Sequence, residues 1–586
     1  MKFLGNVLAT IIGLFVFFML FFFGVLIIGA VFGGDSETVA VKNNSVIELD
    51  LKDVQYDYAG KYEDPWISIF SDDAKIGVSD IIMAIEEAKT DDDIKGISIL
   101  NDESSLGMAQ SKAVRDALEQ FKKSGKFVMA YANVYSQKEY YLNSVANTIY
   151  LNPVGDMDFK GLASEIMFFK ELQEKSGIKM EVIRHGKYKS AVEPFLQNEM
   201  SEANREQITV LLNSIWSSIT ADISKSRNIS VAKLNEIATG LLARTPEMAK
   251  QQTLIDVIAY EDVYHDAIKK ALKVDKDEDY NKVSIMDYTK KVTTTSKITD
   301  SKNDIAIIYA QGEIQGGEGD VNTIGEGSMR RSLQEARKDK KVKAIVLRID
   351  SPGGSALTSD LIWREIELTK KVKPVVVSMG NYAASGGYYI ACNADKIFAE
   401  SNTITGSIGV FGILPNFSEL TKRIGIHVEQ VKTNENAARY SPFVPLDEKF
   451  KEVTLEGVEH IYKTFVTHVA EGRNMTFAQV DSIAQGRVWA GSEAVKIGLV
   501  DKIGGLKDAI KEAASLAKIK KYSTQNYPVY KKDLNDLLAN LPFAKTKAAF
   551  IKEEIGEENY NLMQRVKKVQ EQKGVQASMP FEITIH

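Results

Sequence analysis

The chain has 586 residues, a formal net charge of −6 and 44% hydrophobic residues. This length allows several domains with large cores, and mild acidity with dispersed basic residues argues against a nucleic-acid binder. A single cysteine, Cys392, excludes an internal disulfide framework and a cysteine-based zinc site. The six histidines show no metal-ligating spacing, so we expect neither a metal nor a cofactor.

The first predicted element is a transmembrane helix within residues 1–34. No charged residue lies between Phe3 and Gly34, and most of this stretch is Leu, Ile, Val, Phe or Ala. About 20 apolar residues span a bilayer, whereas the apolar region of a signal peptide has only about 7–15. We therefore expect a retained single-pass anchor. Lys2 before it, and Asp35 after it, favour a body on the extracytoplasmic side of the cytoplasmic membrane.

From about residue 44 onward, apolar strand-like runs alternate with amphipathic helical patterns. Examples are IKGISIL at 94–100, VKAIVLRI at 342–349 and PVVVSM at 374–379. Such alternation predicts an α/β fold.

The chain also contains an internal repeat, visible when residue n is placed beside residue n+248. IKGISILND at 94–102 then matches VKAIVLRID at 342–350, and the offset falls slightly further on, where RNIS at 227–230 matches RNMT at 473–476. Two copies of one α/β domain are predicted. The expected boundaries are an N-terminal repeat at 35–288, a linker at 289–303, a C-terminal repeat at 304–524 and a charged, helical tail at 525–586.

Three small-residue motifs mark the second copy: DSPGGS at 350–355, YAASGGY at 382–388 and TGSIG at 405–409. The first copy has lost the paired glycines, and Gln137 stands where the second copy has Ser385. The first copy therefore cannot perform the same chemistry.

The first copy has its own unusual stretch, HGKYKSAVEPF at 185–195, and the residue equivalent to its Lys189 is Ala437. One copy thus keeps a serine and the other a lysine, which suggests a division of labour. A serine hydroxyl needs a base to become a nucleophile, and a lysine can act as that base when burial lowers its pKa. We predict that Lys189 activates Ser385.

The glycines have a chemical use in such a site. A tetrahedral oxyanion is stabilised by preorganised backbone N–H groups, and a glycine turn presents them free of side chains. Gly353 or Gly354, together with Gly386, would supply the two donors. Ser407 in TGSIG is a candidate to hydrogen-bond Lys189 and orient it.

Together, YAASGGY, DSPGG, TGSIG, YKSAVEPF and GRVWAGSEAVKIGLVDKIGG at 486–505 resemble the bacterial signal peptide peptidase family, SppA type, in its long two-repeat form. The resemblance implies a membrane-anchored serine endopeptidase on tandem Clp-protease or crotonase-like α/β domains. It implies Ser385 as nucleophile, Lys189 as general base, Ser407 as its assistant, and an acyl-enzyme mechanism. It also implies a homotetramer that cleaves remnant signal peptides in the membrane.

Two other classes of function remain open from the residues alone. One is a crotonase-type enzyme acting on acyl-CoA, which the extracytoplasmic placement disfavours because acyl-CoA is cytoplasmic. The other is a catalytically silent membrane scaffold, which the complete motif set disfavours. The sequence does not fix the cleavage preference, the physiological substrate, the role of the tail, or whether Ser385 and Lys189 of one site belong to the same chain.

Overall fold

The computed structural model describes residues 10–24, 41–62, 76–100, 103–296, 302–438, 440–531 and 575–578. Residues 10–24 form a helix whose apolar side chains are exposed, such as Phe15 and Leu20. Among the described residues, no helix combines the length and apolar character needed to cross a membrane. The remainder of the predicted 1–34 anchor lies outside the described residues.

The N-terminal repeat is built on six parallel strands in the order β7-β5-β4-β3-β1-β8. Their bounds are β1 Ser45–Leu49, β3 Ile94–Ile99, β4 Phe127–Tyr135, β5 Thr148–Met157, β7 Val257–Ile258 and β8 Lys282–Ser284. Strands β1 and β3 are almost fully buried, as expected for a parallel sheet that helices cover.

The C-terminal repeat contains the same strand sequence, β19-β15-β14-β12-β9-β20, all parallel. The bounds are β9 Asp304–Gln311, β12 Val342–Ser351, β14 Val375–Ala384, β15 Lys396–Ala399, β19 Lys502–Ile503 and β20 Ser523–Tyr527. Two strands extend this sheet beyond β14: β16 Ile404–Gly406 and β18 Val488–Ala490.

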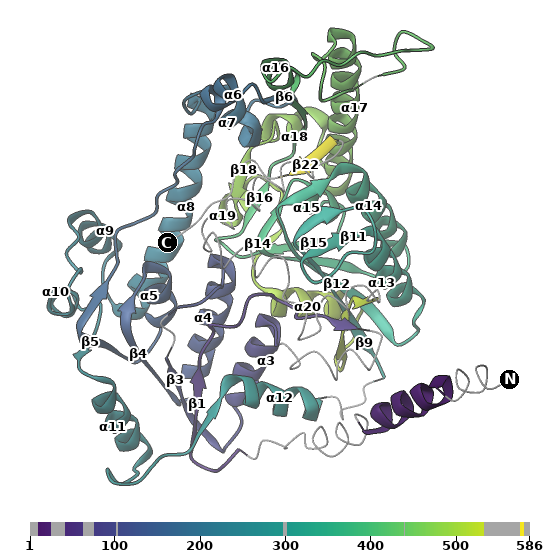
Figure 1. Ribbon diagram of the computed structural model, residues 1–586. Coiled ribbons are helices and arrows are strands. Elements are labelled where there is room, and N and C mark those ends of the chain that lie inside the picture. The colour runs from purple at the N-terminus through teal and green to yellow at the C-terminus, as the bar shows by residue number, and fades with distance from the viewer. Residues whose placement is uncertain are drawn as a thin grey trace.

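The helices repeat with the offsets seen in the sequence. Helix α4, Met108–Lys122, lies 248 residues before α14, Ala356–Lys370. Helix α8, Glu202–Arg227, lies 246 residues before α17, Glu448–Arg473. Both α8 and α17 end at an asparagine in the left-handed conformation, which suits a helix terminus. The α/β architecture with two repeats is thereby confirmed (Figure 1).

The other helices of the N-terminal repeat are α3 Val78–Ala88, α5 Gln137–Asn143, α6 Lys170–Ser176, the 3₁₀ turn Ser190–Val192, α7 Glu193–Leu196, α9 Val231–Gly240, α10 Pro246–Gln251 and α11 Glu261–Leu272. Those of the C-terminal repeat are α13 Glu326–Lys338, α15 Gly386–Ala391, α16 Ser418–Arg423, α18 Phe477–Ile483, α19 Gly491–Lys496 and α20 Leu506–Leu516. Each repeat has its own hydrophobic core between sheet and helices.

A further sheet joins the two repeats, in the order β11-β10-β13-β22-β17-β6. Its strands are β6 Lys179–His185, β10 Glu313–Gln315, β11 Thr323–Gly325, β13 Gly353–Ser355, β17 Val410–Asn416 and β22 Val575–Ser578. Strand β6 of the N-terminal repeat pairs antiparallel with β17 of the C-terminal repeat along its whole length. This pairing carries the loop after β6 into the C-terminal repeat.

The linker and the tail differ in part from the sequence-based expectation. The predicted linker, 289–303, begins inside helix α12, Ile285–Ser296, because Ile285, Tyr288 and Val292 form a buried helical stripe. The described parts of the predicted helical tail are strands: the end of β20, the short strand β21 Val529–Tyr530, which pairs with β2 Lys61–Tyr62, and β22. Residues 532–574 and 579–586 lie outside the described residues.

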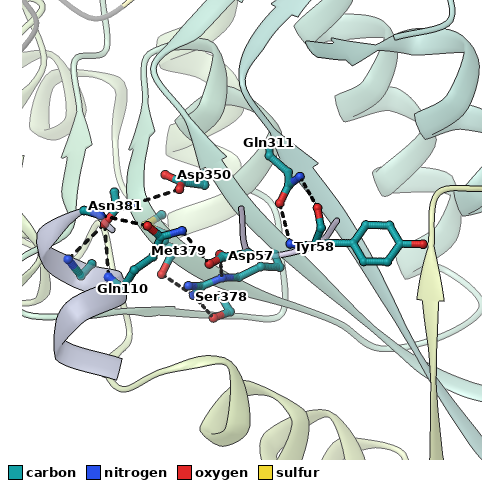
Figure 2. Close-up of polar contacts among 12 residues, drawn as sticks. Asp57, Tyr58, Gln110, Gln311, Asp350, Ser378, Met379 and Asn381 are labelled. Carbon is teal, nitrogen blue, oxygen red and sulfur yellow. Dashed lines mark hydrogen bonds and ion pairs between the residues drawn. The ribbon is translucent and has the colours of Figure 1, made fainter. Parts of the chain in front are cut away.

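A buried polar network also connects the repeats beneath the ends of β12 and β14, as Figure 2 shows. Arg348 on β12 donates to Asp57 Oδ2 of the N-terminal repeat at 2.6 Å and to the Met379 carbonyl at 2.7 Å. Asn381 donates to Asp350 at 3.0 Å, and its amide oxygen accepts from the Gln110 N–H at the start of α4 at 3.2 Å. These contacts fix the strand ends from which DSPGG and YAASGG emerge.

Candidate active site

Ser385 lies at the sharp turn between β14 and α15. The strand is rich in Val and Ala and is buried, and it stops where the glycines begin. Ser385 itself has φ 55° and ψ −113°, a conformation that non-glycine residues rarely adopt. Its N–H donates to the Gly406 carbonyl at 2.8 Å, and its carbonyl accepts from the Tyr389 N–H at 2.8 Å. The turn is therefore held on both sides while the side chain projects from it.

Lys189 reaches this turn from the loop after β6. Tyr188 N–H donates to the Gln485 carbonyl at 2.8 Å, which holds the loop against the C-terminal repeat. A Cβ on Gly486, whose φ is +83°, would lie 2.6 Å from Lys189 Cβ. A Cβ on Gly409 would lie 3.2 Å from Lys189 Cδ. The glycines at these two positions therefore leave room for the lysine stem, most strictly at Gly486.

The amine of Lys189 meets two serines of the other repeat. Lys189 Nζ lies 2.8 Å from Ser385 Oγ, 3.0 Å from Ser407 Oγ and 3.1 Å from the Ser407 carbonyl oxygen. A neutral amine has two N–H donors and one lone pair, so these three contacts satisfy it if Ser385 O–H donates to Nζ. The two N–H groups then donate to the two Ser407 oxygens. This is the arrangement in which the amine can accept the serine proton.

Burial supports the neutral form of the amine. Lys189, Ser385 and Ser407 have no exposed surface. Burial in this apolar site lowers the pKa of Lys189 well below its usual value of 10.5. Burial is the one cause of this shift in pKa, and no carboxylate in the part of the chain that the structure describes counters it. The Phe411 ring lies 5.8 Å from Nζ and contributes to the apolar surroundings.

Two glycines from different turns face each other beside Ser385. A Cβ on Gly386 would lie 3.2 Å from Gly353 Cα, and a Cβ on Gly353 would lie 2.8 Å from the Gly386 nitrogen. A Cβ on Gly354 would instead meet the Ile314 carbonyl oxygen, at 2.1 Å. Of the predicted pair, Gly353 is therefore the residue adjacent to Gly386, and Gly354 faces β10. The Gly353 N–H donates weakly to Ser351 Oγ at 3.2 Å.

The structure thus brings together the predicted residues Ser385, Lys189, Ser407, Gly353 and Gly386 within one chain. A model of peptidase family S49 matches the chain twice, at residues 120–275 and 367–520. The chain belongs to peptidase family S49. It is 38% identical to Protease 4 of Haemophilus influenzae over 75% of this chain and 73% of that protein.

Other S49 relatives give the same assignment. The chain is 38% identical to Protease 4 of Salmonella typhi, over 76% of this chain and 73% of that protein. It is 36% identical to the serine protease SPPA, chloroplastic, of Arabidopsis thaliana, over 74% of this chain and 64% of that protein. The chain is accordingly a serine protease of the long, two-repeat SppA form. A ClpP1 mutant from Listeria monocytogenes shares 17% identity at a TM-score of 0.25, covering 35% of this chain and 94% of that one, which is too low to establish a shared fold.

The first S49 repeat has larger polar side chains at the positions equivalent to Ser385 and Gly387. Gln137, equivalent to Ser385, is buried, and its amide oxygen accepts from the N–H groups of Lys160 and Gly161 at 3.0 and 2.7 Å. Glu139, equivalent to Gly387, accepts from the Ser104 N–H at 3.0 Å. At these two positions the first repeat therefore has polar side chains hydrogen-bonded to its own backbone, where the second repeat has Ser385 and Gly387.

The sequence analysis did not identify Gln207, which positions the loop that carries Lys189. Gln207 on α8 is buried and donates to the Tyr188 carbonyl at 3.1 Å and to Ser190 Oγ at 2.8 Å, on either side of Lys189. Its amide oxygen accepts from the Val488 N–H at 3.3 Å. It therefore ties the lysine loop to β18 of the other repeat. A polar residue on the apolar face of α8 was the only available signal.

Proposed function

We propose that this S49 protease cleaves peptides with a Ser/Lys dyad in which Ser385 is the nucleophile and Lys189 the general base. The observation that carries the proposal is the 2.8 Å contact between a buried lysine amine and a buried serine hydroxyl. No histidine or carboxylate is needed, because the amine is poised to be neutral.

In the first step, Ser385 Oγ attacks the carbonyl carbon of the scissile peptide bond while its proton passes to Lys189 Nζ. Ser407 holds the resulting ammonium with two oxygen acceptors. The oxyanion would receive backbone N–H groups from Gly386 and from the 353–354 turn. Lys189 then protonates the leaving amine, and the acyl-enzyme is hydrolysed when the neutral amine activates a water molecule.

The substrate class and the location belong to the same proposal. We propose a single-pass anchor at residues 1–34 in the cytoplasmic membrane, with the catalytic body on its extracytoplasmic side. The uncharged stretch from Phe3 to Gly34 and the exposed apolar side chains of the 10–24 helix support this. Hydrophobic peptides left in the bilayer, such as remnant signal peptides, would then lie within reach of the site.

We further propose a homotetramer, for which the β6–β17 pairing gives a mechanism. The repeat offset makes residues 162–168 the counterpart of β17, and residues 427–433 the counterpart of β6. Among the described residues, neither counterpart pairs with a β-strand, and residues 427–433 are exposed throughout. Residues 427–433 of one copy could pair with residues 162–168 of the next copy. The contact between the N-terminal and C-terminal repeats that β6 and β17 make within a chain would then be repeated between chains. Such head-to-tail contacts form a ring when the rotation between successive copies closes, which for four copies is a quarter turn.

The test is cleavage of a hydrophobic fluorogenic peptide by the detergent-solubilised protein, with Ser385→Ala and Lys189→Ala in parallel. We expect wild-type activity and loss of at least about 10³-fold in both variants, as for removal of a nucleophile or its base. Circular dichroism and thermal unfolding would show that the variants are folded. Full activity of Lys189→Ala would mean that the base lies elsewhere. If the wild type neither cleaves the peptide nor reacts with a serine-directed phosphonate, the proposal is wrong.

A further inference from the structure

A cavity of about 1160 Å³ lies between the two repeats, and we call it the inter-repeat cavity. Helices α3 and α4 of the N-terminal repeat line one side, and α20 and β9 of the C-terminal repeat line the other, which Figure 1 shows facing each other. Met83 and Ile307 contribute apolar surface, whereas Ser385 and Lys189 take no part in the lining. Ligand-binding cavities commonly enclose about 300–1,000 Å³, so this one can hold a small organic molecule.

Glu400 presents a carboxyl group to this cavity and has no partner for it. The residue follows β15, is 3% exposed and belongs to the lining. Among the described residues, no donor forms a hydrogen bond with its carboxyl group and no cation pairs with it. A Cβ on Gly505 would lie 2.7 Å from Glu400 Oε1, which places the carboxyl group against the start of α20. Native proteins rarely leave a buried carboxyl group without a partner, so this one indicates a ligand site.

The two cations whose charges act on Glu400, Lys112 and Arg348, are already bound by other carboxylates. Lys112 on α4 donates to Asp116 Oδ2 at 2.7 Å. Arg348 on β12 donates to Asp57 Oδ2 at 2.6 Å. Each of these cations therefore lies closer to another carboxylate than to Glu400, which keeps no counter-charge of its own.

The missing counter-charge suits an organic cation. Burial, with the charges of Asp116 on α4 and Asp508 on α20, raises the pKa of Glu400 to about 7, and Lys112 and Arg348 oppose this in part. Among the described residues, no group of three or more acidic, histidine or cysteine side chains could hold a metal ion. An ammonium or guanidinium group needs only one carboxylate, to which its N–H groups donate strong hydrogen bonds. An apolar chain attached to that group would contact the apolar part of the lining.

We propose that the inter-repeat cavity binds a primary ammonium or guanidinium group carried on an apolar chain, with the cation at Glu400. The same chemistry is offered by a free amine and by a lysine or arginine side chain of a peptide. The proposal concerns binding alone and does not depend on the Ser/Lys mechanism. Because a carboxylate binds the cation and a protonated carboxyl group does not, binding should be tighter at about pH 8 than at about pH 6.

Isothermal titration calorimetry of the full-length, detergent-solubilised Ser385→Ala chain measures this binding without cleavage of any probe. The first probe is n-hexylamine, and 1-hexanol, which has the same chain without the positive charge, is its matched ligand. We expect saturable binding of hexylamine at one site and binding of hexanol that is weaker by about tenfold or more, because a charge-assisted hydrogen bond is lost. A capped alanine–lysine–alanine peptide, with norleucine in place of lysine as its neutral counterpart, tests whether a peptide side chain can supply the cation.

Variants made in the same chain locate the site. Glu400→Gln keeps the size of the side chain and removes its charge, so it should weaken hexylamine binding by about tenfold or more and abolish the dependence on pH. Met83→Trp fills the cavity from α3 without changing any charge, so it gives a second measurement if Glu400→Gln does not fold. The matched control is Glu512→Gln, which removes a carboxylate of α20 that lies outside the lining and pairs with Lys502. It should bind hexylamine as the parent chain does.

The outcomes separate the sources of the cation from failure of the inference. Binding of hexylamine and of the lysine peptide, both weakened by Glu400→Gln, would show that the cavity accepts peptide side chains. Binding of hexylamine alone would assign the cavity to a free amine. Equal affinity for hexylamine and hexanol would overturn the inference, as would equal affinity of the parent chain and Glu400→Gln, or the absence of saturable binding. None of these results bears on the Ser/Lys site, which cleavage of the fluorogenic peptide by the wild type tests separately.

Discussion

Lys189 is unusual because its environment favours a neutral amine without any charged partner. Burial lowers the pKa of Lys189, so in the folded chain it is deprotonated at pH values where it is protonated in the unfolded chain. The amine can accept a proton from Ser385 only in the deprotonated form. Peptide cleavage and folding stability should therefore both depend on the titration of this one group.

We expect kcat/KM to fall as the pH is lowered through the folded-state pKa of Lys189, and to level off well below 10.5 on the alkaline side. Between the folded and unfolded pKa values, the unfolded chain binds more protons at this position. The free energy of unfolding contributed by Lys189 therefore rises with pH across that window. Measurement of both profiles, with Lys189→Met as the variant lacking the titration, checks this. An unchanged stability profile in Lys189→Met would contradict a lowered pKa.

Ser407 acts through the lysine, so its loss should affect turnover more than binding. Ser407→Ala removes one acceptor, at 3.0 Å, and leaves the backbone carbonyl contact at 3.1 Å. A lost buried hydrogen bond of about 1–2 kcal/mol corresponds to a fall in kcat of about tenfold, with KM nearly unchanged. The acid limb of the pH profile should also shift.

A control for Ser407→Ala is Ser332→Ala, which removes a 2.7 Å hydrogen bond from a buried serine of α13, remote from the site. It should leave kcat and the pH profile unchanged. An identical pH profile in Ser407→Ala and wild type would assign Ser407 a purely structural role.

Gly353 is required by the close approach of three backbone segments. Its φ of 103° is unfavourable for other residues, and a Cβ would lie 2.8 Å from the Gly386 nitrogen. We expect Gly353→Ala to reduce kcat by about 10²-fold or more, as for loss of an oxyanion donor, while the protein still folds. Gly316→Ala, whose Cβ would meet nothing within 4 Å, is the matched control and should retain full activity. A near-normal kcat in Gly353→Ala would show that this turn does not contribute to catalysis.

At the scale of elements, the ends of β12 and β14 are fixed from outside their own repeat. Arg348 and Asp57 form an ion pair with side chains that are 5% and 2% exposed, and Gln110 donates to the same carboxylate at 3.0 Å. Burial, together with the nearby Asp57 charge, raises the pKa of Asp350 to about 7. The strand end that leads into DSPGG therefore depends on charge balance between the repeats.

We expect Arg348→Met to lower the free energy of unfolding by about 3–5 kcal/mol, because it leaves the Asp57 carboxylate buried without its cation. The double variant Asp57→Leu with Arg348→Met should recover most of that loss. Chemical denaturation of the two single variants and the double variant measures the coupling. Arg364→Met breaks an exposed pair with Glu367 and should cost no more than about 1 kcal/mol. Strictly additive effects at positions 57 and 348 would show that the pair does not couple the repeats.

The sequence predicts those helices and turns whose hydrophobic pattern or glycine motif is supported by the same element in the other repeat. The offset of 248 places α4 over α14 residue for residue, and the glycine motifs mark the turns beside β12 and β14. It could not predict the pairing of β6 with β17, because strand pairing between repeats depends on how two domains dock. It also could not predict β22, since four residues at the end of a charged tail carry no periodic signal of their own.

At the scale of the whole molecule, the serine and the lysine were predictable because each repeat kept what the other lost. Their distance was not, since 196 positions separate them in the chain and only the docked repeats bring them to 2.8 Å. Gln207 could not be predicted for the same reason, because three of its hydrogen bonds join it to Tyr188, Ser190 and Val488, which lie on other segments of the chain. The site is complete within one chain, so catalysis and assembly can be tested separately.

The pairing of β6 with β17 completes the site within a chain. The repeat counterparts of these two strands, residues 427–433 and 162–168, are left without strand partners among the described residues. Residues 427–433 include Val428 and Val431, which are 41% and 103% exposed, and the side chains of residues 162–168 alternate between half-buried and exposed. Charged side chains on such an edge discourage strand addition. We therefore expect the double variant Val428→Asp, Val431→Asp to shift the detergent-solubilised protein from a ring to a monomer in analytical ultracentrifugation.

The same variant should still cleave a short fluorogenic peptide, because Ser385 and Lys189 meet within the monomer. Val372→Asp introduces a charge at another exposed valine, 63% accessible, and should leave both the assembly and the activity intact. If the double variant assembles like the wild type, residues 427–433 are not the contact. If it dissociates and loses activity with its fold preserved, neighbouring copies contribute to the site through contacts that the single chain lacks.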